Sequence, residues 1–130
     1  MLLSDKVAIV TGSSRGIGKA MALGLAREGA TVVVAARSET ERPNAPGTVY
    51  TTAAEIEAMG GKALPVRCNM REEESIYAMA QRTIDALGHI DVLVNNAGVG
   101  TYRPFLEITV KEWDPVMDIT CGRPSFAAKR

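Results

Sequence analysis

The first group of residues with a chemical signature is a set of three glycines at Gly12, Gly16 and Gly18. Gly12 permits a sharp turn, and Gly18 allows a helix to pack closely. Because Gly16 has no Cβ, a diphosphate can approach the backbone there. The N–H groups and the positive dipole end at the start of a following helix favour a bound phosphate. The spacing therefore predicts a diphosphate site at the beginning of the chain.

A second group, Asn95-Asn96-Ala97-Gly98, follows an apolar run near the middle of the second half of the chain. Both groups have a plainer interpretation. Three glycines alone are compatible with an ordinary turn, and an Asn-Asn pair is typical of a turn after a strand. The glycines, however, stand between an apolar run and a helix-length stretch, and that position favours phosphate binding.

Four short apolar runs supply the strands that would position these groups. Each is rich in β-branched residues and almost continuously apolar, as expected of a strand that is buried on both faces. The predicted strands are Lys6–Val10, Thr31–Ala36, Ala63–Val66 and Ile90–Val94. Pro65 falls within the third run, and a proline is tolerated mainly in an edge strand. The sequence therefore places the third strand at an edge.

Helix-length stretches separate the strands. The first stretch predicts a helix that ends at Gly29 and has one apolar face. The residues expected on that face are Ile17, Ala20, Met21, Gly24 and Leu25. A second helix begins near Thr51 or Thr52 and stops at Gly60-Gly61, and a third runs from Ile76 to Leu87 before Gly88. Alternating strands and helices predict an α/β fold with a doubly wound parallel sheet of about four strands in the order 3-2-1-4.

Composition limits the class of protein. The chain has 130 residues, 46% of them hydrophobic, with 15 basic and 15 acidic side chains, so it suits one folded domain. Zero net charge indicates no nucleic-acid partner, and no apolar run is long enough to indicate a membrane partner. One histidine and two cysteines without ligand spacing predict no metal site. Reduced thiols and the absence of a secretory leader favour a cytoplasmic location.

Together the two motifs make the chain resemble the short-chain dehydrogenase/reductase family. The resemblance extends from about Lys6 to Ile119 and rests on Thr11-Gly-x-x-x-Gly-x-Gly18 with Asn95-Asn-Ala-Gly98. The segment Gly47–Arg71 also looks like members described as hydroxysteroid-dehydrogenase-like. The resemblance implies a Rossmann-like fold, an NAD(P) cofactor, hydride transfer with a small-molecule alcohol or carbonyl substrate, and a homo-oligomeric full-length protein.

The resemblance also implies roles for individual residues. The backbone from Ser13 to Ile17, which includes Ser14 and Arg15, would hold the diphosphate. Asn69 stands where the family usually has an Asp that meets the adenine, and the backbone N–H of Met70 would contact the same ring. Residues expected on the ribose and nicotinamide side are Asn95, Ala97 and Gly98. Asn95 would in addition pin the central strands.

Charge at the end of the second predicted strand bears on which nicotinamide cofactor binds. A carboxylate there would bind the ribose 2′-hydroxyl of NAD(H), but this chain has Arg37, which can pair with a 2′-phosphate. Arg15 would add a second positive charge and Ser38 a hydroxyl. Glu39 and Glu41 oppose this interpretation, because a loop could bring either carboxylate near. The balance favours NADP(H) over NAD(H).

The acid–base residues of the family are missing from this chain. Members use a Tyr with a Lys four residues later and a Ser upstream. Four residues after the three tyrosines stand Ala54, Gln81 and Leu106, so no Tyr-x-x-x-Lys occurs and we expect no catalytic residue here. The chain then represents the cofactor-binding portion of an NADP-dependent oxidoreductase. The alternative is a non-catalytic nucleotide-binding remnant or an inactive fragment.

The last residues depart from the family pattern. An Asn would normally follow Ile119, but Thr120-Cys-Gly-Arg-Pro-Ser-Phe126 stands there. One A inserted before the Thr120 codon permits the reading Asn-Leu-Arg-Pro-Pro-Phe, which is close to the family's continuation. We therefore hypothesise a lost base, with a fragment or gene decay as the alternatives. This hypothesis divides the chain into an incomplete NAD(P)-binding domain at 1–119 and an aberrant tail at 120–130.

Overall fold

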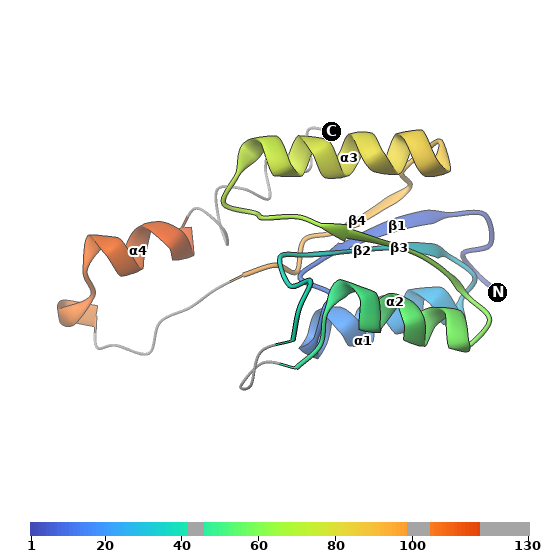
Figure 1. Cartoon of the computed structure of the whole chain (residues 1–130), viewed down its shortest axis with the longest axis horizontal. Coiled ribbons are helices and arrows are strands. Elements are labelled where there is room, and N and C mark those ends of the chain that lie inside the picture. The colour runs from blue at the N-terminus through green and yellow to red at the C-terminus, as the bar shows by residue number, and fades with distance from the viewer. Residues whose placement is uncertain (42–45, 99–104, 118–130) are drawn as a thin grey trace.

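The computed structural model describes residues 1–41, 46–98 and 105–117, in which strands and helices alternate (Figure 1). The elements are β1 (Val7–Thr11), α1 (Gly16–Arg27), β2 (Thr31–Ala36), α2 (Val49–Ala58), β3 (Lys62–Arg67), α3 (Glu73–Leu87), β4 (Val92–Val94), the 3₁₀ helix η1 (Phe105–Glu107) and α4 (Val110–Val116). No helix in these ranges is long and apolar enough to cross a membrane. The predicted tail at 120–130, with its boundary after Ile119, lies outside the described residues.

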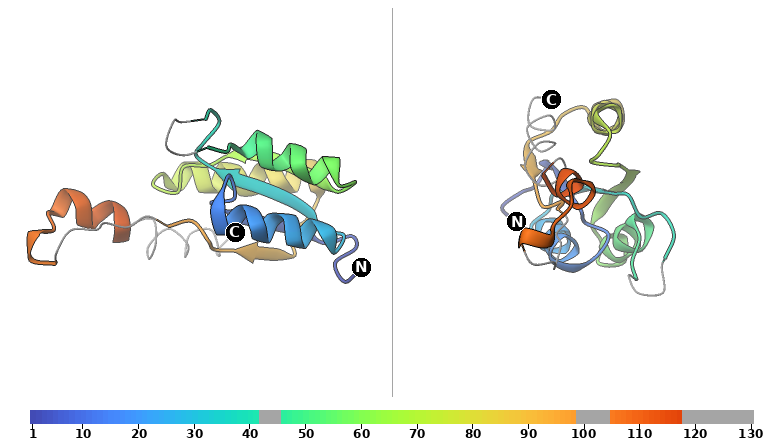
Figure 2. Two further views of the ribbon diagram at one scale, coloured as in Figure 1. Left: turned by 90° about the horizontal axis from the view of Figure 1, so that it is seen from below. Right: turned by 90° about the vertical axis from the view of Figure 1, so that its left-hand side faces the viewer.

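All four strands run parallel in a single sheet with the order β3-β2-β1-β4. Helices α1 and α2 cover one face of the sheet, and α3 covers the other, as Figures 1 and 2 show from three directions. The predicted α/β class, the doubly wound Rossmann-like arrangement and the strand order are confirmed.

The two central strands are buried on both faces, which explains their continuously apolar sequences. In β1, Val7 and Ile9 belong to the core cluster that α3 completes, whereas Ala8 and Val10 belong to the cluster under α1 and α2. Every residue of β1 is buried. Alternate side chains of a strand point to opposite faces, so a strand covered by helices on both sides is apolar except at its ends, where β1 has Thr11.

The buried face of α1 differs from the predicted one. Ile17 is 75% exposed, and the buried residues of the helix are Gly18, Ala22 and Ala26. The predicted Met21 and Leu25 are partly buried and pack against the same core cluster. Small side chains let the helix axis approach the sheet closely, and they carry little hydrophobicity of their own. The predicted face is therefore right for Met21 and Leu25 and wrong for Ile17, and it omits the small buried residues.

Pro65 lies in β3, which is the edge strand that the sequence predicts, and it stands opposite Val34 of β2. The Cys68 N–H, directly after β3, donates to the Ala36 carbonyl on the β2 side. Backbone groups of a strand alternate in direction, so counting back from Cys68 turns the Pro65 nitrogen away from β2. Its missing N–H thus costs no hydrogen bond within this sheet.

The carboxyl ends of the parallel strands meet along one edge of the sheet. The last residues of the strands are Thr11, Ala36, Arg67 and Val94. The segments that follow them carry both sequence motifs. In open parallel sheets ligands bind outside these ends, where neighbouring connections leave the sheet on opposite faces. Here β1 connects through α1 on one face, whereas α3 leads into β4 from the other face.

Candidate functional site

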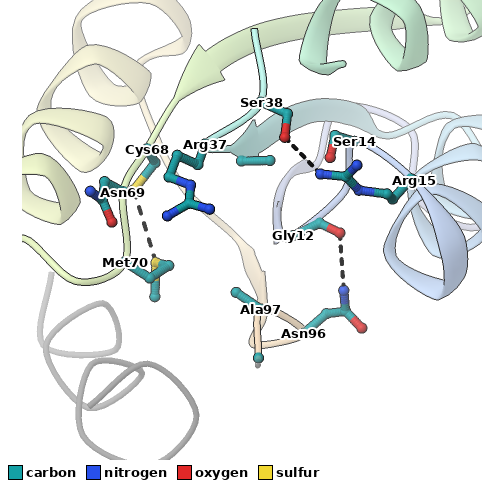
Figure 3. Close-up of a pocket in the computed structure, with 12 residues that line it drawn as sticks. Gly12, Ser14, Arg15, Arg37, Ser38, Cys68, Asn69, Met70, Asn96 and Ala97 are labelled. Atoms are coloured by element: carbon teal, nitrogen blue, oxygen red, sulfur yellow. Dashed lines mark hydrogen bonds between the residues drawn. The ribbon is translucent and has the colours of Figure 1, made fainter. Parts of the chain in front are cut away.

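A pocket opens at this carboxyl edge, between the segments that follow all four strands (Figure 3). Its lining residues are Gly12, Ser14, Arg15, Ala36, Arg37, Ser38, Cys68, Asn69, Met70, Asn96, Ala97 and Gly98. Most of the predicted site residues are among them. The predicted residues outside the lining are Ser13, Gly16, Ile17, Gly18 and Asn95. The sequence missed Ala36, Cys68 and Asn96.

The three glycines of the turn have different physical reasons to be glycine. Gly12 adopts a φ of 69° and Gly16 a φ of 61°, both in the left-handed region that other residues rarely enter. A Cβ on Gly12 would lie 3.0 Å from the Cα of Ala97, whereas one on Gly16 would meet nothing within 4 Å. A Cβ on Gly18 would lie 2.2 Å from the Gly12 carbonyl oxygen. Gly18 thus lets α1 start directly against the turn, and Gly16 leaves open space before the helix.

The beginning of α1 is suited to an anion. Arg15 is the N-cap residue in an extended conformation, and its side chain makes no capping hydrogen bond. The first turn of α1 contains no acidic residue. The first backbone N–H groups of a helix have no partner within the helix, and the helix dipole is positive there. These groups and the open space at Gly16 fit a diphosphate.

Two serines of the turn make hydrogen bonds that stabilise the fold, Ser13 through its hydroxyl and Ser14 through its backbone carbonyl. The Ser13 hydroxyl is fully buried, donates to the Val10 carbonyl at 2.7 Å and accepts from the Ala35 N–H at 3.2 Å. It therefore ties β1 to β2. The carbonyl of Ser14 accepts from the Thr52 hydroxyl of α2 at 3.2 Å. These bonds hold the turn in place and occupy the hydroxyl of Ser13, whereas Ser14 lines the pocket.

Two arginines line the pocket near the end of β2. Arg15 donates through Nη2 to the Ser38 hydroxyl at 2.7 Å, and the guanidinium of Arg37 points into the pocket (Figure 3). Neither Glu39 nor Glu41 lines the pocket, and the described lining contains no carboxylate at all. The opposing carboxylates of the loop thus stay outside the site. This end of the pocket is positively charged.

Glu39 is bound elsewhere. The Tyr50 hydroxyl donates to its Oε2 at 2.5 Å, and Arg67 Nε lies 3.5 Å from its Oε1. The hydrogen bond to Glu39 raises the pKa of Tyr50 above its ordinary value of 10.0, because losing the proton would place two negative charges together.

Asn96 joins the carboxyl ends of β1 and β4. Its side-chain Nδ2 donates to the carbonyls of Thr11 and Gly12, both at 3.2 Å (the latter bond is drawn in Figure 3). The backbone N–H groups of Asn96 and Ala97 both donate to the hydroxyl of buried Thr11 at 3.1 Å. The sequence assigned the pinning role to Asn95, but among the described residues no hydrogen bond joins its side chain to β1. Among the described residues Asn96 makes these bonds, and the role of Asn95 stays a prediction.

A single physical signal distinguishes the two asparagines. Val94 is paired with Val10 in the β1–β4 ladder. Successive side chains of a strand alternate between the two faces of the sheet, so neighbouring residues at the end of β4 are expected to point in different directions. Asn95 is exposed and Asn96 is half-buried against the turn. The pattern Asn-Asn does not by itself say which member turns inward, and this is why the sequence missed it.

Asn69 and Met70 lie at the far end of the pocket, after β3. Asn69 Oδ1 accepts from the Arg71 N–H at 3.0 Å, and its Nδ2 donates to Glu72 at 3.1 Å. The Asn69 side chain therefore shapes the turn into α3 as well as lining the pocket. Burial raises the pKa of the Cys68 thiol, whose Sγ lies 3.9 Å from Met70 Sδ, so this part of the lining is neutral and apolar.

The sequence of this chain is similar to those of known proteins of one family. A family model described as short chain dehydrogenase matches residues 6–122. Hydroxysteroid dehydrogenase-like protein 2 of Xenopus laevis is 51% identical over 110 residues, which are 85% of this chain and 26% of that protein. The human protein of the same name is 42% identical over 127 residues, which are 98% of this chain and 30% of that protein.

Solved structures share the fold. A dehydrogenase from Xanthomonas campestris has 40% identity and a TM-score of 0.94, over 99% of this chain and 48% of its own. A metagenomic short-chain oxidoreductase, solved in complex with NADP, has 37% identity and a TM-score of 0.86, over 99% of this chain and 56% of its own. The chain thus spans about half of these structures and less than a third of the curated relatives. By its sequence and its fold, the chain belongs to the short-chain dehydrogenase family.

Proposed function

We propose that this chain binds NADP(H) and forms the cofactor-binding portion of an oxidoreductase that moves a hydride between NADP(H) and an alcohol or carbonyl substrate. The observation that carries the proposal is the positive end of the pocket. Arg15 and Arg37 both line it, and the described lining holds no carboxylate. The metagenomic relative solved with NADP supports the same cofactor class.

Different groups of residues would contact different parts of the cofactor. The backbone of residues 13–17 and the start of α1 would hold the diphosphate, and Asn69 and Met70 would border the adenine. The residues assigned to the ribose and nicotinamide side are Asn95, Ala97 and Gly98, next to which Asn96 fixes the backbone. When bound, the cofactor supplies or accepts the hydride.

The 2′-phosphate is the group that would separate NADP(H) from NAD(H). Arg37 and Arg15 can form charge-assisted hydrogen bonds with it, and guanidinium groups suit phosphate geometry. Ser38 already accepts from Arg15, so it holds that guanidinium in place. A free 2′-hydroxyl carries no negative charge, so it cannot form these charge-assisted bonds with either guanidinium. This asymmetry favours NADP(H).

The chain itself accounts for binding, and its sequence contains no Tyr-x-x-x-Lys for proton transfer to a substrate. The second candidate function, a non-catalytic nucleotide-binding module, is favoured by that same feature. An activity assay separates the two for the purified 130-residue chain. We expect no turnover with alcohols or carbonyl compounds, and measurable turnover would overturn our assignment of the acid–base residues to the part of the relatives that this chain does not match.

A fluorescence titration of the same chain with NADPH and with NADH tests the cofactor. We expect NADPH to bind at least about tenfold more tightly, since each charged hydrogen bond contributes roughly 1.5–3 kcal/mol. Arg37→Gln should remove most of that difference and leave NADH affinity nearly unchanged. If NADH binds more tightly than NADPH, the cofactor assignment is wrong.

A further inference from the structure

One acidic side chain lies close in sequence to the positive end of the pocket, and its position needs an explanation. Glu39 directly follows Ser38, which lines the pocket, yet Glu39 itself does not. Each oxygen of its carboxylate has its own partner: the Tyr50 hydroxyl at 2.5 Å on Oε2 and Arg67 Nε at 3.5 Å on Oε1. We call Glu39, Tyr50 and Arg67 the acid clasp.

Both partners of Glu39 belong to elements that are fixed in the fold. Tyr50 lies in the first turn of α2, whose Val49 N–H donates to the Ser38 carbonyl at 3.0 Å. Arg67 is the last residue of β3 and pairs in register with Ala36. The carboxylate is therefore bound to α2, which follows its loop, and to β3, the strand beside β2 in the sheet.

The charge of Glu39 matters because of what it would do in the pocket. Arg15 and Arg37 provide two positive charges there. A carboxylate beside them would compete for the same guanidinium groups and would repel a 2′-phosphate, while it could accept a hydrogen bond from a 2′-hydroxyl. Glu39 is next in sequence to Ser38, which lines this end of the pocket, so its carboxylate is a candidate for that position.

We propose that Tyr50 and Arg67 are positioning residues that determine cofactor specificity: by holding Glu39 outside the pocket, they preserve its preference for a 2′-phosphate over a 2′-hydroxyl. This inference rests on the proposed function. The raised pKa of Tyr50, caused first by its bond to Glu39 and opposed by the charge of Arg82, agrees with a protonated phenol that donates to the carboxylate at neutral pH.

The test uses two probes that differ only in the group in question, 2′,5′-ADP and ADP, titrated into the 130-residue chain. Tyr50→Phe removes the hydroxyl and keeps the ring. We expect affinity for 2′,5′-ADP to fall about threefold, the size of a single exposed charge interaction, while affinity for ADP stays the same. Tyr50→Phe combined with Arg67→Gln should enlarge the fall.

Glu39→Gln supplies the matched control, because it removes the charge that the clasp restrains. This variant should bind 2′,5′-ADP at least as tightly as the wild-type chain, and Tyr50→Phe should have no further effect in its background. A merely structural role for Tyr50 predicts the opposite: affinity for both probes would fall, and the fall would persist beside Glu39→Gln.

Two readouts separate the failure of this inference from the failure of the proposed function. If the wild-type chain binds 2′,5′-ADP no better than ADP, the proposed function is overturned, and the role of the clasp with it. If the wild-type chain discriminates but Tyr50→Phe leaves the ratio unchanged, only the clasp is overturned. The spectroscopic titration of the Tyr50 phenol, obtained as the difference from Tyr50→Phe, should shift to lower pH in Glu39→Gln, and an unchanged titration would mean that no clasp forms in solution.

Discussion

Helices α1 and α2 pack on the same face of the sheet, but their N-termini are built in opposite ways. At α2 the Thr48 hydroxyl accepts from the Thr51 N–H at 3.1 Å, and the Thr51 hydroxyl accepts from the Thr48 N–H at 2.8 Å. This is a complete capping box. At α1 the N-cap is Arg15, with no side-chain cap and a glycine at each side of the turn.

The difference separates a helix end made for stability from one kept for a ligand. Reciprocal caps satisfy the free N–H groups of α2 from within the chain. A bound anion can satisfy the same groups at α1, at the cost of stability when no anion is present. The start of α2 is thus satisfied from within the chain, whereas the start of α1 is left open to a ligand.

The largest expected effect is at Gly18. In Gly18→Ala the new Cβ would meet the Gly12 carbonyl oxygen and force α1 off the turn, so we expect the free energy of unfolding to fall by about 2–3 kcal/mol. NADPH binding should be lost with it. Gly24→Ala on the same helix is the matched control, since its Cβ would meet nothing within 4 Å. That variant should gain about 0.5–1 kcal/mol in urea denaturation followed by circular dichroism, and equal losses in both variants would contradict the close approach.

The next effect comes from giving α1 the cap it lacks. Arg15→Asp places a carboxylate at the N-cap and removes a cation from the pocket, so affinity for 2′,5′-ADP should fall at least about tenfold. Stability should stay within about 1 kcal/mol of the wild-type chain, because the new cap offsets the lost Arg15–Ser38 bond. Arg15→Ala separates the missing cation from the added carboxylate. Unchanged affinity in calorimetric titrations of Arg15→Asp would remove α1 from the site.

A smaller effect distinguishes the two asparagines after β4. Asn96→Ala leaves the carbonyls of Thr11 and Gly12 without their side-chain donor, and we expect a loss of about 1–2 kcal/mol in the free energy of unfolding. Asn95→Ala should stay within about 0.5 kcal/mol in the same denaturation experiment. The reverse order would restore the pinning role to Asn95.

The smallest effect is at the closed helix end. Thr48→Ala removes the acceptor for the Thr51 N–H and should cost about 1 kcal/mol of stability without changing the affinity for NADPH. Thr48→Ser keeps the acceptor and should retain most of the stability. A loss of cofactor affinity in Thr48→Ala, with stability intact, would mean that the two helix ends are not separate in function.

The sequence predicts the sheet well because its signals are local. Continuous apolar runs mark strands that are buried on both faces, and Pro65 marks the edge strand, so the strand order follows. The glycine turn is equally local, and Gly12 and Gly16 adopt the left-handed conformations that their residue type allows.

What the sequence missed depends on direction and on distant contacts. The fully buried residues of α1 were missed because they are small, and the bonds of Asn96 were missed because a residue pair does not show which member turns inward. The acid clasp joins residues that are far apart in the chain. No spacing rule places Arg67 beside Glu39; only the register of β3 on β2 does so.

Because the nitrogen of Pro65 faces away from β2, the two edges of the sheet differ in how well they can pair with a further strand. A strand added beside β3 would meet a missing donor at the middle of its new ladder, which hinders further pairing and self-association at that edge. At the opposite side, β4 pairs only with β1 among the described residues and has no proline in its three positions. Pairing with a further strand, whether that strand belongs to a longer relative's own chain or to another chain, is therefore favoured beside β4.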